Sequence, residues 1–174
     1  MRPIRSICRP RCRGAGCYAV RRRHRRGILS PSVCLLVQGE KEMLVGQQVL
    51  RYGPGCYVQA GVAMPVSGQV TRASEASPYY GIRIDLDPRE VNALVLEMGL
   101  RLSSGQADPP AVSVERADGA MLDVFVRLLR MLDRPRDLPV LGRLIKQELI
   151  YHLVSANAVS AKRSTGSARI TTSP

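Results

Sequence analysis

Short apolar runs alternate with glycine and proline through residues 32–86, a pattern typical of an antiparallel β layer. In chain order the runs are SVCLLVQ, KEMLVG, QQVLRYG, GCYVQAG, VSGQVTRAS and YYGIRIDL. Glycines separate or end them, where a tight reversal or a positive φ is needed. The clearest turn is Gly53-Pro54-Gly55. The first half of the chain is therefore predicted to consist of short β-strands.

The pattern changes to a helical one after Asp87. Asp87 is an N-cap type of residue, Pro88 suits the first helical position, and Glu90 can bond back to the cap. These signals predict a short helix that ends near Met98. A connection rich in Ser, Gly and Pro follows, and it leads to a brief strand over Val112 to Glu115.

Two helices joined by a short charged loop are predicted in the last third. The first begins after Asp118, and its apolar stripe recurs at helical period: Met121, Leu122, Val124, Phe125, Leu128, Leu129 and Leu132. The loop from Asp133 to Asp137 ends this helix, and a second helix runs to about Val154. Five connecting residues make an αα-hairpin. The predicted fold class is α+β, with a mainly antiparallel β-barrel or sandwich followed by an α-helical hairpin.

The positive charge of the chain lies mostly in its first thirty residues. Of a net charge of +12, residues 1–30 contribute ten arginines and no acid, whereas residues 31–159 hold thirteen basic and fourteen acidic residues. The part expected to fold is thus nearly neutral, and net charge does not indicate that it binds nucleic acid. Residues 1–30 and 155–174 show no apolar period, so both are expected to be disordered tails around one domain over 31–154. The Arg-rich tail predicts at most weak, non-specific nucleic-acid binding.

Several segments, in order, resemble the N-terminal regulatory domain of AraC/XylS-type bacterial transcription regulators. The most specific are the LVQG, PVSGQV and IDLDP runs and the helical hairpin LLRMLDRPRDLPVLGRLIKQELIYHLV, and the resemblance covers Pro31 to Val154. It implies a cupin-like β-barrel that senses a small-molecule effector and helices that form a homodimer. In such regulators a separate C-terminal module with two helix-turn-helix motifs reads DNA. The pattern of that module does not follow in this sequence. Apart from weak contacts of the Arg-rich tail, DNA binding is therefore expected only through a C-terminal module that is missing here. The reading frame is expected to be truncated or shifted.

Candidate site residues follow from this comparison. In the barrel, Tyr and Arg side chains can orient a small polar or carboxylate ligand, and the effector candidates are Tyr57, Met64, Tyr79 and Arg83. The alternative is that the tyrosines are half-buried sheet residues and the arginine is solvated. Alternation along YYGIRIDL sends Tyr79 and Arg83 to one face and Tyr80 and Ile82 to the other, and the latter face is favoured as core.

The predicted dimer interface lies on the last helix. Its candidates are Leu141, Leu144, Ile145, Glu148, Leu149 and His152. The same apolar stripe could instead cover the barrel within one chain, and it is wide enough for both roles.

No catalytic residue, metal or cofactor is predicted. Cys8, Cys12, Cys17 and His24 are soft ligands, but their spacing matches no standard zinc site. The β region contains no His, which argues against a metal-dependent barrel enzyme. An odd total of five cysteines without a signal segment favours the cytoplasm, with no membrane contact. The alternatives are a stand-alone cupin-like binding protein or enzyme, or a gene fragment without independent activity.

Overall fold

A computed structural model describes residues 15–20, 25–99 and 111–166. Contacts divide the chain into two compact units: the barrel unit, up to Pro88 together with Ala111–Gly119, and the helical unit, Arg89–Pro110 together with Ala120–Pro174. The predictions for Cys8, Cys12 and His24 lie outside the described residues, as do those for 167–174.

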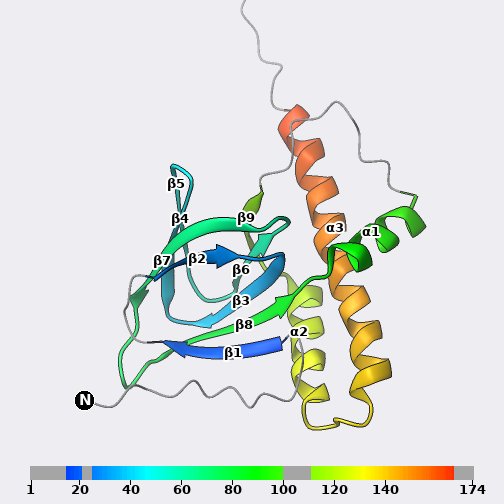
Figure 1. The fold of residues 1–174 in the computed structure, drawn as a ribbon, viewed down its shortest axis with the longest axis horizontal. Coiled ribbons are helices and arrows are strands. Elements are labelled where there is room, and N and C mark those ends of the chain that lie inside the picture. Colours follow the sequence, from blue (N-terminus) through cyan, green and yellow to red (C-terminus); the bar gives the residue numbers. More distant parts are fainter. Residues whose placement is uncertain (1–14, 21–24, 100–110, 167–174) are drawn as a thin grey trace, which may run out of the picture. The chain divides into compact units, whose positions relative to one another are not determined.

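The barrel unit contains two antiparallel sheets (Figure 1). In spatial order, the five-stranded sheet is β1 (Ala15–Val20), β8 (Tyr79–Asp85), β3 (Ser32–Gln38), β6 (Cys56–Ala60) and β9 (Val112–Arg116). The four-stranded sheet is β2 (Arg25–Leu29), β7 (Met64–Arg72), β4 (Glu40–Val45) and β5 (Gln48–Tyr52). Most neighbours in the sheets are distant in sequence, so long-range pairing sets the architecture.

Side chains from both sheets meet in one core. Its buried members are Leu36, Met43, Tyr52, Val58, Ala60, Val70, Tyr79 and Val112. Alternation along each strand explains the selection: on β4, Met43 is buried whereas its neighbour Leu44 is 42% exposed. Burying one large apolar side chain stabilises the fold by about 1.5–3 kcal/mol, so this shared core holds the two sheets together.

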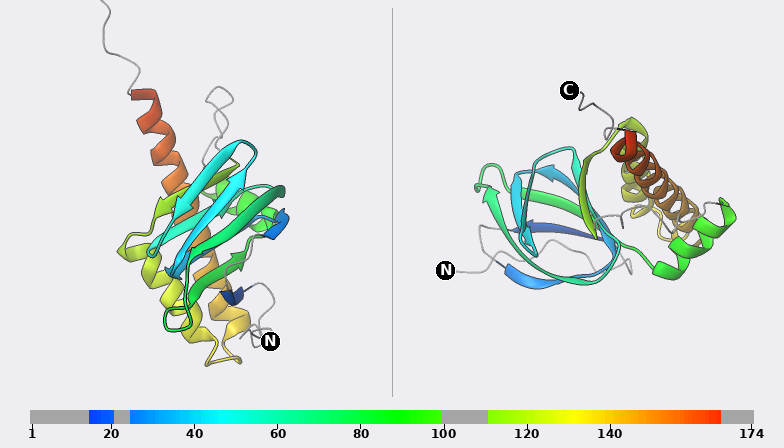
Figure 2. Two further views of the ribbon diagram at one scale, coloured as in Figure 1. Left: turned by 90° about the vertical axis from the view of Figure 1, so that its left-hand side faces the viewer. Right: turned by 90° about the horizontal axis from the view of Figure 1, so that it is seen from above.

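The helical unit consists of α1 (Pro88–Glu97), α2 (Gly119–Met131), the short π-helical turn η1 (Leu138–Gly142) and α3 (Arg143–Gly166). Helices α2 and α3 lie side by side and antiparallel (Figures 1 and 2). Their buried side chains are Met121, Val124 and Phe125 on α2 and Leu149, Ile150 and Leu153 on α3.

Ion pairs connect the three helices. Arg127 of α2 pairs with Asp123 one turn earlier and with Glu148 of α3. Lys146 Nζ lies 2.7 Å from Glu90 Oε2 and links α3 to α1. These side chains are partly exposed, so each pair adds at most about 1 kcal/mol and mainly fixes the register of the helices.

The predicted fold class, an antiparallel barrel or sandwich followed by a helical hairpin, is confirmed. The prediction of disorder in residues 1–30 is wrong for β1 and β2, which pair with β8 and β7. Local composition missed them because these strands are held by backbone pairing with partners distant in sequence, which no local pattern specifies. The tail prediction is also wrong for residues 155–166, which continue α3 because they contain several alanines and no proline. Where the independently folding part begins and ends stays a prediction.

Candidate functional site

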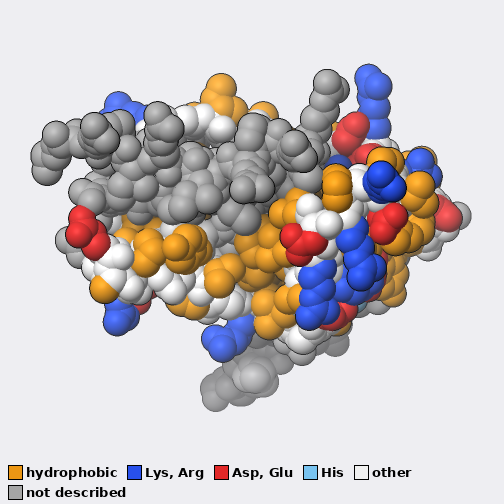
Figure 3. Space-filling model, turned by 90° about the horizontal axis from the view of Figure 1, so that it is seen from below, with side chains coloured by type: hydrophobic (Ala, Val, Ile, Leu, Met, Phe, Trp, Pro, Cys, Tyr) orange, Lys and Arg blue, Asp and Glu red, His pale blue; other side chains and the backbone are white. Residues whose placement is uncertain are grey.

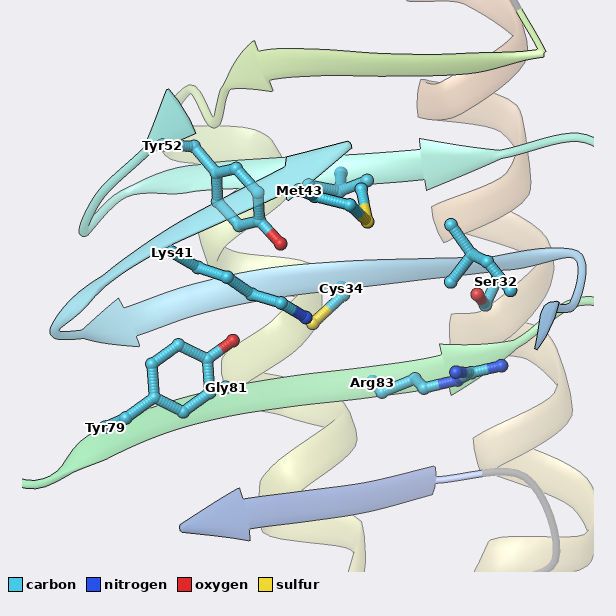
Figure 4. Close-up of a pocket in the computed structure, with 10 residues that line it drawn as sticks. Ser32, Cys34, Lys41, Met43, Tyr52, Tyr79, Gly81 and Arg83 are labelled. Carbon is cyan, nitrogen blue, oxygen red and sulfur yellow. The ribbon is translucent and has the colours of Figure 1, made fainter. Parts of the chain in front are cut away.

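A cavity of about 280 Å³ lies inside the barrel unit (Figure 4). Its lining residues come from six strands of both sheets: Leu29, Ser32, Cys34, Lys41, Met43, Tyr52, Val58, Tyr79, Gly81 and Arg83. Small-molecule sites are usually apolar pockets of about 300–1,000 Å³ with a few convergent polar groups. This cavity has that composition, and its volume lies just below that range.

Two inward-facing glycines leave room in the cavity region. A Cβ added at Gly81 of β8 would lie 3.2 Å from Tyr79 Oη and 3.6 Å from Cys34 Sγ. A Cβ at Gly68 of β7 would lie 3.3 Å from Lys41 Cε. Contacts this close mean that larger residues would displace the cavity side chains. The sequence therefore keeps the space open by placing its smallest residue at both positions.

Four polar side chains from four strands point toward the middle of the cavity (Figure 4): Cys34 of β3, Lys41 of β4, Tyr52 of β5 and Tyr79 of β8. We refer to these four residues as the polar cluster. Burial raises the pKa of both phenols and of the thiol above their ordinary values of 10.0 and 9.0. The hydroxyls and the thiol are therefore neutral near pH 7.

Lys41 is the basic residue of the polar cluster. Burial lowers the pKa of its amine below 10.5, and the nearby Arg83 lowers it further, while Cys34 acts in the opposite direction. Among the residues that the structure describes, no carboxylate forms an ion pair with Lys41. The amine therefore faces the cavity without a carboxylate partner from the described residues.

Arg83 lies at the other end of the labelled group, near Ser32 (Figure 4). Its Nε donates to Asp85 Oδ1 at 2.8 Å, and its side chain is 26% exposed. Arg83 is thus paired with Asp85, but its charge still acts on the Lys41 amine, whose pKa it lowers.

Two of the four predicted effector residues line the cavity, namely Tyr79 and Arg83. Tyr57 is buried but does not line it, and its neighbour Glu115 accepts a hydrogen bond from it; burial and Glu115 raise its pKa to about 12. Met64 packs against the core cluster outside the lining.

Sequence reasoning missed Cys34, Lys41 and Tyr52. The available signal was alternation: Lys41 occupies the same face of its strand as the apolar Met43, which points a lysine into the barrel.

The predicted interface residues differ in exposure. Leu141 and Leu144 are 42% and 53% exposed, whereas Leu149 is fully buried. Ile145, Glu148 and His152 are partly buried. The exposed apolar surface of this region also includes Val140 and Tyr151.

Within the described part of the chain, no group of three His, Cys, Asp or Glu side chains lies close enough together to hold a metal ion. Cys17 lies on β1, but its side chain is outside the described set. None of the described helices has the length and apolarity needed to cross a membrane.

Comparison with known proteins defines the class of this chain. The family model of the AraC-type transcriptional regulator N-terminus matches residues 18–161, and the chain belongs to this family. No curated protein matches the sequence.

Two solved structures of low identity are similar to this chain. ToxT of Vibrio cholerae strain SCE256, solved with an unsaturated fatty acid, is 10% identical, with 91% of this chain and 57% of that chain covered and a TM-score of 0.49. The AraC-like transcriptional activator CuxR is 16% identical, with 83% and 49% covered and a TM-score of 0.44. The chain thus spans about half the length of these two proteins.

Proposed function

We propose that this chain is the effector-sensing and dimerisation part of an AraC-type transcription regulator. The observation that carries this proposal is a cavity with an inward polar cluster inside the barrel of a family member. A small molecule that binds one state of the domain more tightly shifts the population toward that state. In a complete regulator, this shift would change how two DNA-binding modules are presented.

The sensing role is tested by narrowing the cavity. In a thermal-shift screen of small polar and charged compounds, at least one compound is expected to raise the melting temperature of the unmodified protein, because a ligand of the folded state stabilises it. Gly81→Val should abolish that rise by filling the space beside Tyr79 and Cys34. Gly27→Val is the matched control: Gly27 is an exposed strand glycine outside the cavity lining, and its Cβ would meet nothing within 4 Å. A screen without hits, or hits unaffected by Gly81→Val, would contradict the sensing role.

Dimerisation is proposed to use the exposed leucines near the start of α3. The double change Leu141→Glu and Leu144→Glu should convert a dimer into a monomer in sedimentation velocity, because charge would enter an apolar interface. Leu96→Glu on α1 is the control, since Leu96 is 78% exposed and lies outside the proposed interface, and it should leave the dimer intact. A monomeric unmodified protein, or a double variant that stays dimeric, would refute this assignment.

DNA reading is proposed to belong to a separate helix-turn-helix module. On the face that Figure 3 displays, the described Lys and Arg side chains lie beside Asp and Glu side chains and form no broad surface of one sign. Strong sequence-independent binding to phosphates needs clustered positive charge, which the described side chains of this face do not form. We further propose that the regulator works in the cytoplasm and that the Arg-rich start contributes only weak, non-specific contacts to nucleic acid.

A further inference from the structure

The amine of Lys41 in the polar cluster has no carboxylate partner among the described residues. Lys41 alternates with two acidic neighbours on β4, but both are engaged elsewhere: Glu40 pairs with Arg72 and Glu42 pairs with Arg51. Those arginines are about four-fifths exposed, so these pairs lie on the outside of the sheet. The β4 sequence thus sends one lysine inward and leaves its acidic neighbours outside.

The groups that face the Lys41 amine are neutral or positive. Cys34, Tyr52 and Tyr79 keep their protons near pH 7, and Arg83 is cationic but paired with Asp85. Among the described residues, the hydroxyls of Tyr52 and Tyr79 have no hydrogen-bond partner. Since no fully buried side-chain N or O atom of the described residues is left unsatisfied, these two hydroxyls are not fully buried. The hydroxyls are therefore open to the cavity and can donate to a ligand.

This arrangement favours a ligand with one negative charge over a neutral or a doubly charged ligand. A partly desolvated cation without a counterion is unfavourable, and a bound anion removes that penalty through charge-assisted hydrogen bonds. Because Arg83 already has Asp85 as a partner, Lys41 is the basic residue of the lining for which one carboxylate of a ligand would provide the counterion. A doubly charged ligand would bring an excess negative charge into the barrel.

Apart from Ser32 and Gly81, the rest of the lining is apolar. Leu29, Met43 and Val58 provide hydrocarbon surface along the cavity. We propose that the cavity binds a small monocarboxylate, whose carboxylate is held by the Lys41 ammonium and the hydroxyls of Tyr52 and Tyr79, and whose hydrocarbon part contacts Leu29, Met43 and Val58. This inference rests on the proposed sensing function and names its ligand class.

Titration calorimetry with hexanoate, octanoate and phenylacetate, each compared with its primary amide, tests the inference. At least one acid should bind the unmodified protein about tenfold or more tightly than its amide, because only the acid forms charged hydrogen bonds with Lys41. Lys41→Met removes the amine at similar side-chain length. It should weaken binding of the acid by about tenfold or more and leave the affinity for the amide unchanged. Tyr52→Phe should produce a smaller loss for the acid.

Lys146→Met is the matched control, because it removes the same charge from the helical unit, and it should leave carboxylate affinity unchanged. Denaturant unfolding without ligand separates binding from folding: Lys41→Met should unfold at no lower denaturant concentration, since it removes a desolvated charge. Amides that bind as tightly as acids, or an acid affinity insensitive to Lys41→Met, would overturn the carboxylate assignment. If neutral compounds bind in a manner blocked by Gly81→Val while no acid does, the ligand class is wrong and the sensing function stands; if no compound of either kind binds, both fail.

Discussion

Phe125→Ala is expected to lower the free energy of unfolding of the helical unit by about 3–5 kcal/mol. Phe125 is 1% exposed, and its neighbour Val124 on α2 is completely buried. Removing the ring loses its burial and leaves a cavity that close-packed neighbours cannot fully close. The loss should appear as a lower midpoint in denaturant unfolding followed by circular dichroism at a helical wavelength.

Val126→Ala provides the comparison for this result. Val126 is the next residue of the same helix but is 42% exposed, so its truncation should change the unfolding free energy by less than about 0.5–1 kcal/mol. Equal losses for the two variants would show that Phe125 is not a core residue of the helical unit.

Gly39→Ala is expected to destabilise the barrel unit strongly. Gly39 connects β3 and β4 with φ of 91°, a backbone conformation that costs an L residue about 1–3 kcal/mol. Its added Cβ would also lie 2.7 Å from the backbone oxygen of Arg72 and 3.2 Å from a ring carbon of Tyr79. Backbone cannot move aside as a flexible side chain can, so crowding adds about 1–3 kcal/mol.

Gly46→Ala separates the two causes. Gly46 also has a positive φ, 59°, but an added Cβ there would meet nothing within 4 Å. It should therefore show only the backbone penalty of about 1–2 kcal/mol. Since Tyr79 lines the cavity, Gly39→Ala but not Gly46→Ala should also weaken ligand binding in calorimetry. Equal effects of the two changes on stability and binding would contradict the close contact at Gly39.

The sequence was more informative about elements than about the cavity. The β runs between residues 32 and 86 and the Asp87-Pro88 helix start were found where local signals predicted them. Tyr79 and Arg83 were placed on one face of their strand, and both line the cavity. The opposite face, favoured as core, is buried at Ile82 but 43% exposed at Tyr80, and Tyr79 belongs to the barrel core as well.

The site itself depended on relationships that local patterns do not contain. Cys34, Lys41 and Tyr52 come from three different strands. In its local sequence, each resembles an ordinary strand residue without a functional role. They acquire a shared role only because β3, β4 and β5 are assigned to two sheets whose inner faces meet.

By itself, the sequence determined the order of elements, strands first and a helical hairpin last, and through its motifs the resemblance to a regulator family. These features are local, since side-chain alternation, helical period and capping act over a few residues. Only the tertiary structure decided that β1 and β2 join the sheets and that Tyr57 lies outside the cavity. It also decided that Lys41 lies inside the cavity, with no carboxylate partner among the described residues. The physical reason is that strand pairing, sheet closure and desolvation depend on residues far apart in sequence, whose positions no local pattern specifies.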